Sequence, residues 1–309
     1  MGEDNATRPI GLGFLGCGDF GNFQKDKILG GDPKFELKEV WLGRRSGPEA
    51  KSNLVNNPEI EAVYVCTPCA HHSINSIEAM RGGKHVHVEK PLYGLKETIL
   101  QSQASMKILY IGYHRRQSDT WLAMRASLQA RCLTNISPAK LIFTAIDPCS
   151  PDQDTETSLE DLKTVIGQTL VHEIDVLTWT YPDSNFEVTS VSPQPNSGSC
   201  LKGIITHPNG MKTEIELINT KTGADAKRYL NRCMVHSTDG SIEKFEVEYF
   251  ANTEHMCYVY KEAYQKCWAE FYSLVRGDSY DVESRLDSYL KTDRVLGAFH
   301  LAAEEFFKK

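Results

Sequence analysis

The chain has 309 residues, with 34 Lys and Arg against 41 Asp and Glu, which gives a formal net charge of −7 at pH 7. This acidic balance argues against a protein that grips nucleic acid or an anionic membrane surface, because both attract a net positive field. A hydrophobic content of 40% and a charged content of 24% are typical of globular proteins. The length is sufficient for two domains.

Location in the cell is indicated by three features of the sequence. No stretch reaches the roughly 18 consecutive apolar residues of a membrane helix. The first ten residues, MGEDNATRPI, are acidic and polar, unlike a secretory signal peptide. The nine cysteines are odd in number and irregularly spaced, which is typical of reduced thiols. These features predict a cytoplasmic protein.

A short segment that contains Cys66, Cys69, His71 and His72 resembles a metal or redox site at first sight. Such a site needs a second pair of ligands or a thioredoxin-like context, and neither occurs at a recognisable spacing. The sequence therefore predicts no metal ion here.

The first 115 residues or so alternate short apolar runs with polar, helix-compatible stretches, which is the βαβ pattern of a parallel sheet covered on both faces. Between the third and fourth strands we expect a helix with Ile74, Ile77 and Met80 on one face, closed by Gly82 and Gly83. Strands are predicted at residues 10–15, 37–42, 62–66, 85–88 and 108–111.

The pattern changes after a predicted helix that carries Trp121, Met124, Leu128 and Cys132 at helical spacing. Longer strands follow, with turn signals at residues 208–210 and 238–240. These strands are predicted at residues 139–146, 186–191, 201–206, 211–219, 229–236 and 241–249, and helices at 258–276 and about 281–307. Residues 148–161 are acidic and rich in Pro, Ser and Thr, which indicates a mobile loop. This half predicts an α+β domain with a large, open, mainly antiparallel sheet.

A glycine-rich turn follows the first predicted strand and opens into a predicted helix. In such turns one glycine permits the tight bend, one lets the backbone approach a pyrophosphate, and one lets helix and strand pack closely. The helix N-terminus then supplies free N–H groups. The pattern favours dinucleotide binding over a purely structural turn. The candidate cofactor-binding residues are Gly16, Gly18, Asp19, Phe20 and Gly21.

The end of the second strand indicates which dinucleotide is bound. About 20 residues beyond the turn, an acidic residue would bond the ribose hydroxyls of NAD, but this chain has Gly43, Arg44 and Arg45. A small residue followed by arginines makes room for a 2′-phosphate and pairs with it. The sequence favours NADP(H), with NAD(H) as the alternative. Alternatively, both arginines have no binding role and are solvated side chains at the end of a loop.

Two segments carry candidate acid–base residues. Glu89 and Lys90 follow the fourth strand, at the carboxyl end where open parallel sheets bind ligands. A helix over residues 167–177 would place Gln168, His172 and Asp175 along one face. An imidazole there can take a proton from a hydroxyl at neutral pH, and a nearby lysine cation would favour the alkoxide that forms.

Five segments together carry a family resemblance: GFLGCGDFG, AVYVCTP followed by His72, GKHVHVEKPL, IGYHRR and TLVHEIDVLTW. In this order they resemble the Gfo/Idh/MocA oxidoreductases, and most of all the inositol dehydrogenases among them. The resemblance implies a Rossmann domain with a doubly wound parallel sheet over residues 1–117. An α+β domain would follow over 118–309, with its C-terminal helix packing back on the first domain. It also implies a homo-oligomer, a dimer or tetramer, that forms through the open sheet.

The resemblance further implies hydride transfer between a nicotinamide and a cyclic polyol or sugar. His172 would take the hydroxyl proton, and Lys90 would hydrogen-bond the same oxygen. The residues that would line or support the substrate pocket are Tyr113, Arg115, Arg116 and Asp175, and those that would enclose the cofactor are Thr67, Pro68, His72 and Glu89. As plain structure, the two arginines would be salt-bridged surface residues and Asp175 a helix-stabilising acid.

Two features depart from the family pattern. Gln168 stands where the inositol dehydrogenases have an aspartate, and an amide has no charge to stabilise an imidazolium. Only twelve residues separate Arg45 from Pro58, which is short for a helix and a further strand. The parallel sheet is therefore expected to lack one element. An alternative function follows, that of a catalytically weakened or inactive member that senses a nucleotide or sugar.

Overall fold

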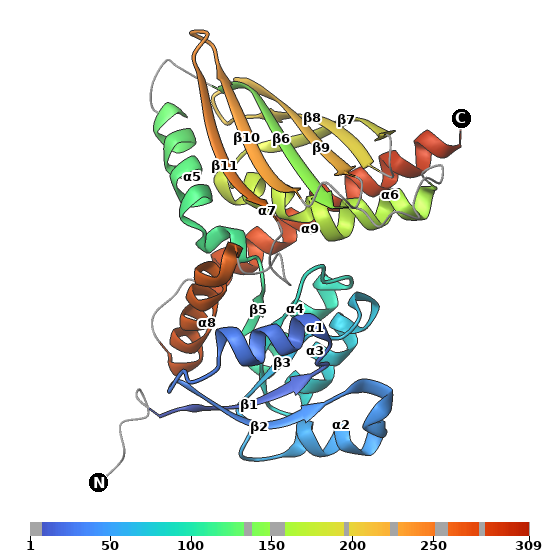
Figure 1. Cartoon of the computed structure of the whole chain (residues 1–309), viewed down its shortest axis with the longest axis vertical. Helices are drawn as coiled ribbons and strands as arrows, with labels where there is room; N and C mark the ends of the chain where they lie inside the picture. The colour runs from blue at the N-terminus through green and yellow to red at the C-terminus, as the bar shows by residue number, and fades with distance from the viewer. Residues whose placement is uncertain are drawn as a thin grey trace. The chain divides into compact units, whose positions relative to one another are not determined.

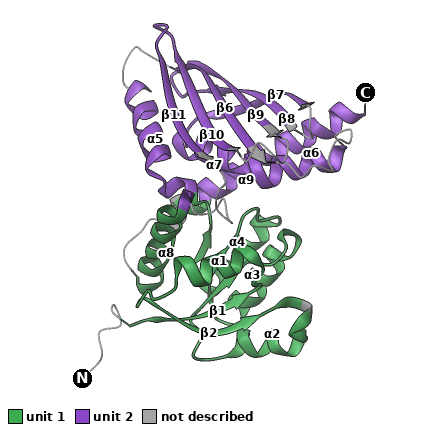
Figure 2. Ribbon diagram, in the orientation of Figure 1, with its two compact units in different colours: residues 1–114, 261–286 green, residues 115–260, 287–309 purple. Residues whose placement is uncertain are grey.

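The computed structural model describes residues 8–132, 138–148, 158–194, 198–222, 228–250, 259–277 and 282–308 (Figure 1). The chain divides into two compact units (Figure 2): unit 1 comprises residues 1–114 and 261–286, and unit 2 comprises residues 115–260 and 287–309. Unit 1 is thus discontinuous in the sequence, unlike the division expected between residues 117 and 118. Most of the loop predicted over 148–161 lies outside the described residues.

Unit 1 is built on a five-stranded parallel sheet with the strand order β2-β1-β3-β4-β5. The observed strands begin and end within two residues of their predicted bounds. They are β1 (Ile10–Leu15), β2 (Phe35–Trp41), β3 (Ala62–Val65), β4 (His85–Val88) and β5 (Leu109–Ile111). The connecting helices are α1 (Asp19–Phe23), which continues as a π-helix over Gln24–Ile28, α2 (Gly47–Asn56), α3 (His72–Arg81) and α4 (Leu95–Ser105).

The edge of this sheet explains the short segment before Pro58. After β2 the chain forms a short 3₁₀-helix and α2 and then enters β3, which pairs with β1 on the other side. Strand β2 is therefore the edge strand, and the strand that extends a six-stranded doubly wound sheet beyond this position is absent from the described sheet. The predicted fold class is confirmed, including its missing element.

A row of large side chains crosses one face of the sheet in unit 1. The register places Phe14, Tyr64, His87 and Tyr110 next to one another on four strands. Helix α8 (Lys261–Arg276) covers this row, and the ring of Trp268 lies 5.2 Å from that of Tyr64 and 4.4 Å from that of His87. Burial of these aromatic surfaces accounts for the return of α8 to the first unit.

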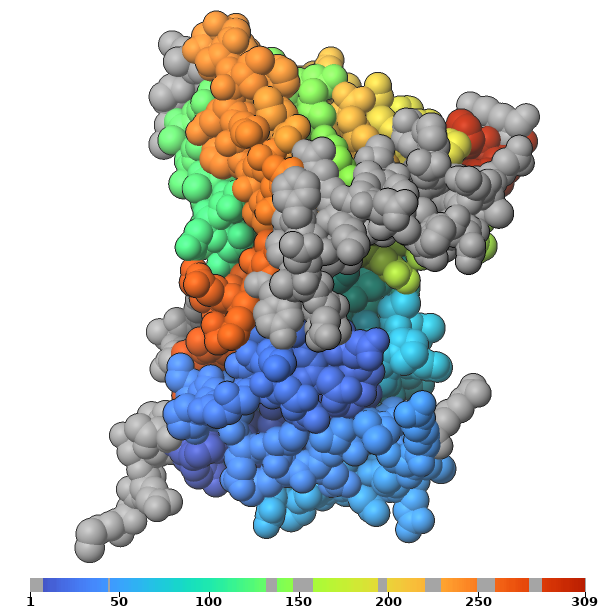
Figure 3. Space-filling view, viewed as in Figure 1, coloured from blue at the N-terminus to red at the C-terminus, as the bar shows by residue number. Residues whose placement is uncertain are grey.

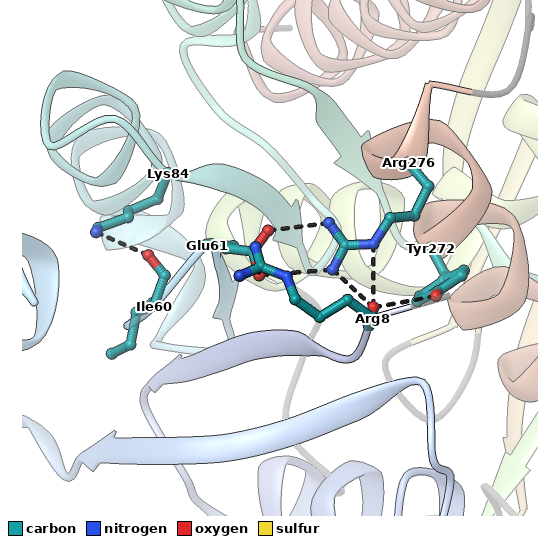
Figure 4. A network of polar contacts seen from close by, with 6 residues as sticks. All are labelled: Arg8, Ile60, Glu61, Lys84, Tyr272 and Arg276. Atoms are coloured by element: carbon teal, nitrogen blue, oxygen red, sulfur yellow. Dashed lines mark hydrogen bonds and ion pairs between the residues drawn. The ribbon is translucent and has the colours of Figure 1, made fainter. Parts of the chain in front are cut away.

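Polar contacts fix the C-terminal end of α8 (Figure 4). Arg276 donates from Nη1 to Glu61 Oε2 over 2.9 Å and from Nε to the carbonyl oxygen of Arg8 over 3.2 Å. The hydroxyl of Tyr272 donates to the same carbonyl over 3.1 Å. The space-filling view shows the orange surface of α8 against the blue surface of the N-terminal elements (Figure 3).

The buried position of His87 makes the stability of unit 1 sensitive to acid. Its Nδ1 has no hydrogen-bond partner among the described residues, and burial lowers its pKa to about 3, with the guanidinium of Arg285 acting in the same direction. An unfolded histidine titrates near 6.5. Between these pH values the unfolded chain binds a proton at His87 that the folded chain does not bind. The contribution of His87 to the free energy of unfolding is therefore fully present above pH 6.5 and is lost as the pH decreases below it.

We expect this group to lower the free energy of unfolding by about 2 kcal/mol between pH 7 and pH 5. The variant His87→Phe should lose that part of the decrease, whereas His85, whose pKa burial lowers to about 4, contributes in both proteins. Denaturant titrations at the two pH values measure the difference. An equal decrease in the wild type and the variant would contradict this assignment.

Unit 2 contains a six-stranded sheet with the order β11-β10-β6-β9-β8-β7. Every neighbouring pair is antiparallel except β6 and β9, so the predicted mainly antiparallel sheet is confirmed. The strands are β6 (Pro138–Pro148), β7 (Asn185–Gln194), β8 (Gly198–Thr206), β9 (Lys212–Thr222), β10 (Arg228–Ser237) and β11 (Ile242–Phe250).

Four helices gather on one face of this second sheet (Figure 1). They are α5 (Asp119–Cys132), α6 (Leu159–Val165), α7 (Val171–Thr180) and α9 (Val282–Phe307), of which α9 begins in residues of unit 1. Strand residues alternate accordingly, and Leu141, Phe143 and Ala145 of β6 are almost completely buried. None of the described helices is both long and apolar enough to cross a membrane.

Candidate functional site

The glycine-rich turn joins the end of β1 to α1. Gly16 has a φ of +89°, and a Cβ at this position would lie 2.5 Å from the carbonyl oxygen of Cys66, so a larger residue would collide with the backbone after β3. Beside Gly18, which precedes α1, no described atom lies within 4 Å of the position of a Cβ. The turn thus leaves open space next to the first N–H groups of α1, which have no intrahelical acceptor.

The remaining predicted residues of the turn stand in the first turn of α1. Asp19 is its first residue, and the ring of Phe20 packs edge-on against Tyr264 of α8 at 5.6 Å. A Cβ at Gly21 would lie 3.2 Å from the carbonyl oxygen of Gly16, which is closer than most real contacts of this kind. The spacing of the glycines therefore keeps the backbone of helix and turn in close contact, as the sequence predicted.

The segment Gly43–Arg45 forms one turn of 3₁₀-helix after β2. Gly43 adopts a φ of +70°, and the backbone N–H of Leu42 donates to Ser46 Oγ over 3.0 Å, which closes the turn. The side chain of Arg45 is exposed, and that of Arg44 lies outside the described part of the structure. A guanidinium at this strand end is thus accessible to a ligand in solution.

Helix α3 holds the loops that follow β3 and β4. His72 Nε2 lies 2.7 Å from the carbonyl oxygen of Thr67, and Nδ1 lies 2.8 Å from that of Pro91. Asn75 donates from Nδ2 to the hydroxyl of Thr67 over 3.0 Å. Thr67 and Pro68, which the sequence placed at the cofactor, therefore belong to a loop that is fixed by the side chains of α3.

The buried face of α3 differs from the prediction. Ile74 is 54% exposed, whereas His72, Asn75 and Ser76 are buried. The first half of the helix packs on the polar backbone of loops, so its buried side chains form hydrogen bonds there in place of apolar contacts. Apolar spacing alone does not reveal such a surface.

The two acid–base candidates after β4 have different surroundings. The carboxyl group of Glu89 is buried and accepts a hydrogen bond of 2.7 Å from the hydroxyl of Tyr64. Burial raises the pKa of Glu89 to about 7, although the bond from Tyr64 and the charge of Lys90 act in the opposite direction. Lys90 is only partly buried, and Tyr113, after β5, is 6% exposed. Glu89 thus lies in the interior of unit 1, where it bonds Tyr64, while Lys90 is partly exposed to solvent.

Unit 2 places the histidine candidate on a buried helix. Helix α6 continues through a π-helix over Ile166–Leu170 into α7. Gln168 lies in the π-helix and is exposed, whereas His172 and Asp175 are 6% and 1% exposed. The three predicted residues share one helical segment, but Gln168 is on its solvent side.

Both predicted arginines are buried in ion pairs with α7. Arg115 pairs with Glu173 and also donates from Nη2 to Asn231 Oδ1 on β10 over 2.7 Å. Arg116 donates to both carboxylate oxygens of Asp175, with 2.8 Å between Nε and Oδ2. The arginines are salt-bridged, as the structural reading had it, but in the interior of unit 2 and not at its surface.

Several partners of the predicted residues were missed by sequence reasoning. The missed partners are Glu173 and Asn231, both paired with Arg115. The arginines are adjacent in HRR while Glu173 and Asp175 are two residues apart in HEID, so the spacing gives no signal for these pairs. The candidates form two sets, one around the carboxyl ends of β1, β3 and β4 in unit 1 and one around α7 in unit 2. Within the described ranges, no group of three or more His, Cys, Asp or Glu residues could hold a metal ion.

The parallel sheet, the glycine turn after its first strand and the second unit with its large sheet define a protein of the Rossmann dinucleotide-binding class. Residues 10–112 match the Gfo/Idh/MocA model, described as an oxidoreductase family with an NAD-binding Rossmann fold. The resemblance seen in the sequence is confirmed over these residues, which are similar to the NAD-binding Rossmann part of that oxidoreductase family.

Similar proteins extend the comparison beyond the residues that the family model matches. Inositol 2-dehydrogenase of Agrobacterium fabrum is 24% identical over 260 residues, which are 75% of this chain and 72% of that protein. The scyllo-inositol 2-dehydrogenase (NADP(+)) of Bacillus subtilis is 25% identical over 153 residues, 45% of this chain and 43% of that protein.

A solved structure shows the same fold for both units. Myo-inositol dehydrogenase from Lactobacillus casei in complex with NAD(H) and myo-inositol has a TM-score of 0.73 with this chain at 17% identity. The match covers 96% of this chain and 95% of that one.

Proposed function

We propose that the protein is an NAD(P)-dependent dehydrogenase that acts on a CH–OH group of a cyclic polyol or sugar similar to inositol. The observation that carries this proposal is the imidazole of His172 on a helix that two buried ion pairs fix, in a chain whose other unit has a dinucleotide-binding turn. The relatives named above as inositol dehydrogenases support the substrate class.

The residues of unit 1 fit a dinucleotide. The open space beside Gly18 and the first N–H groups of α1 would receive a pyrophosphate. When bound, the nicotinamide supplies the acceptor for a hydride. Lys90 would donate a hydrogen bond to the substrate oxygen and stabilise negative charge on it, and His172 would accept its proton. Tyr113, after β5, and the thoroughly paired Arg115, Arg116 and Asp175 would support the pocket.

Turnover assays test this proposal directly. We expect reduction of NADP(+) or NAD(+) in the presence of at least one compound from a panel of inositols, aldoses and cyclic dihydrodiols. Absorbance at the reduced nicotinamide band measures the rate. Binding of NADPH without turnover of any compound in the panel would contradict dehydrogenase activity.

We also propose a preference for NADP(H) that depends on Arg44 and Arg45. The double variant Arg44→Ala/Arg45→Ala should raise the Kd for NADPH about tenfold or more, because each lost charge-assisted bond to phosphate costs about 1.5–3 kcal/mol. The Kd for NADH should change little. Fluorescence titration measures both constants, and Arg81→Ala at the end of α3 is a matched control for the loss of an exposed arginine. An equal change for the two dinucleotides would contradict the phosphate role.

A homo-oligomer of two or four chains, working in the cytoplasm, completes the proposal. The face of the unit 2 sheet opposite its helices carries the partly exposed apolar residues Ile142, Ile204 and Met234 beside the Lys140–Glu216 ion pair. Such a mixed surface is suited to a subunit interface. Sedimentation at micromolar concentration that shows only monomers would contradict the oligomer. The odd number and irregular spacing of the nine cysteines support the cytoplasmic location.

A further inference from the structure

Both ring nitrogens of His72 in α3 face hydrogen-bond acceptors, so each nitrogen needs a proton to form its hydrogen bond. The side chain is 3% exposed, and each of its ring nitrogens faces a backbone carbonyl oxygen, that of Thr67 at 2.7 Å and that of Pro91 at 2.8 Å. A carbonyl oxygen only accepts hydrogen bonds, and a neutral imidazole has one N–H. Only the imidazolium donates to both oxygens at once, and a neutral ring would bring two lone pairs together at one of them.

The two carbonyls belong to different loops at the carboxyl ends of neighbouring strands. Thr67 follows β3, and Pro91 directly follows Lys90 after β4. The next residue of α3 extends the contact, because the hydroxyl of Ser73 donates to the carbonyl oxygen of Gly94 over 3.3 Å. The first turn of α3 therefore holds the chain on the C-terminal side of Lys90 at two points.

We propose that His72 is a positioning residue which, as the imidazolium, ties the loop after β3 to the loop after β4 and so fixes the backbone that carries Lys90. The proposal rests on the proposed function for the role of Lys90. It assigns His72 to the loops, in place of direct contact with the cofactor. When the ring loses a proton, one of the two hydrogen bonds is lost and the Lys90 loop becomes less constrained.

The charges around His72 determine the direction of its titration. Burial lowers its pKa below the ordinary value, the hydrogen bonds to the two carbonyls raise it, and the positive charges of Lys90 and His71 lower it. Both of these neighbouring charges are cationic. Both hydrogen bonds are therefore present below the lowered pKa of His72, and one of them is released as the pH rises through that pKa.

Nuclear magnetic resonance of protein labelled with ¹⁵N-histidine tests the tie without any substrate. At pH 5 we expect two ring N–H signals from His72, absent from His72→Gln, and at pH 8 one signal. A single ring N–H at every pH from 5 to 8 would overturn the proposal. Because the wild-type protein supplies this result, the test does not depend on the folding of the variant.

Kinetics of the variants separates positioning from contact with the cofactor. In His72→Gln, kcat should decrease about tenfold or more, because small displacements of a catalytic group have large effects. The Kd for the dinucleotide should change less than about twofold, well below the loss expected of a direct charged contact. His71→Gln removes an exposed neighbouring imidazole whose charge lowers the pKa of His72, so kcat should not decrease in this control. An increase in Kd with unchanged kcat would overturn positioning in favour of a cofactor contact. If the wild type turns over no substrate, the proposed function fails, while the ring N–H signals still decide the tie.

Discussion

Replacement of His172 by alanine should reduce kcat for polyol oxidation by about 10²–10⁴-fold, the usual contribution of a general base. The Kd for the dinucleotide should stay at its wild-type value, because His172 is not among the residues proposed to hold the dinucleotide. Lys90→Met should also reduce kcat, by about 10²–10³-fold, because it removes a donor to the developing alkoxide. Steady-state kinetics and fluorescence titration measure the two quantities.

Two control measurements make this first prediction specific. His236→Ala removes a partly buried imidazole from β10, outside the candidate set, and should leave kcat unchanged. Circular dichroism should show that His172→Ala is folded before its rate is compared. Full activity in His172→Ala would remove the assigned base, and a parallel loss of dinucleotide binding would indicate a structural defect.

The sequence predicted those parts of the fold that depend on local pattern. Short, mainly apolar runs of four to six residues located every strand of the parallel sheet, and the short stretch before Pro58 predicted the missing strand, because a helix alone fills it. Local pattern could not predict the return of α8, although the family resemblance implied that a C-terminal helix packs back on the first domain. Trp268 of α8 packs on a row formed by four strands, and that row exists only after the strands are paired in register.

The candidate site was also predictable only where it depends on local sequence pattern. Motif order identified His172 and Lys90, but the partners of the neighbouring charges lie far away in the chain, as Arg115 and Glu173 do. Helical spacing also misplaced the buried face of α3, because His72 and Asn75 are buried against backbone carbonyl and hydroxyl groups that hydropathy does not register. Pattern in the sequence reports which side chains avoid water, and it does not report which polar groups they meet.

Loss of one partner from the buried pair between Arg116 and Asp175 should strongly destabilise unit 2. The pair is almost fully buried, and Thr292 of α9 adds a hydrogen bond of 3.1 Å to the same carboxylate. Asp175→Leu leaves the guanidinium uncompensated in the interior, which costs about 3–5 kcal/mol. Denaturant titration followed by intrinsic tryptophan fluorescence measures the loss, and Trp179, whose ring lies 6.0 Å from the Arg116 guanidinium, is one of the four tryptophans that contribute to the signal.

The double variant Arg116→Met/Asp175→Leu decides whether the cost comes from the unpaired charge or from lost packing. Because it removes both charges together with their desolvation penalty, it should be more stable than Asp175→Leu by about 1–4 kcal/mol. The partly exposed pair between Lys163 and Glu304 in the same unit serves as the matched control, and Glu304→Leu should unfold near the wild-type midpoint because solvent screens this pair. If the changes in the free energy of unfolding caused by Arg116→Met and Asp175→Leu were additive, packing alone would hold α7. The ion pair between Arg116 and Asp175 could then not be what fixes His172.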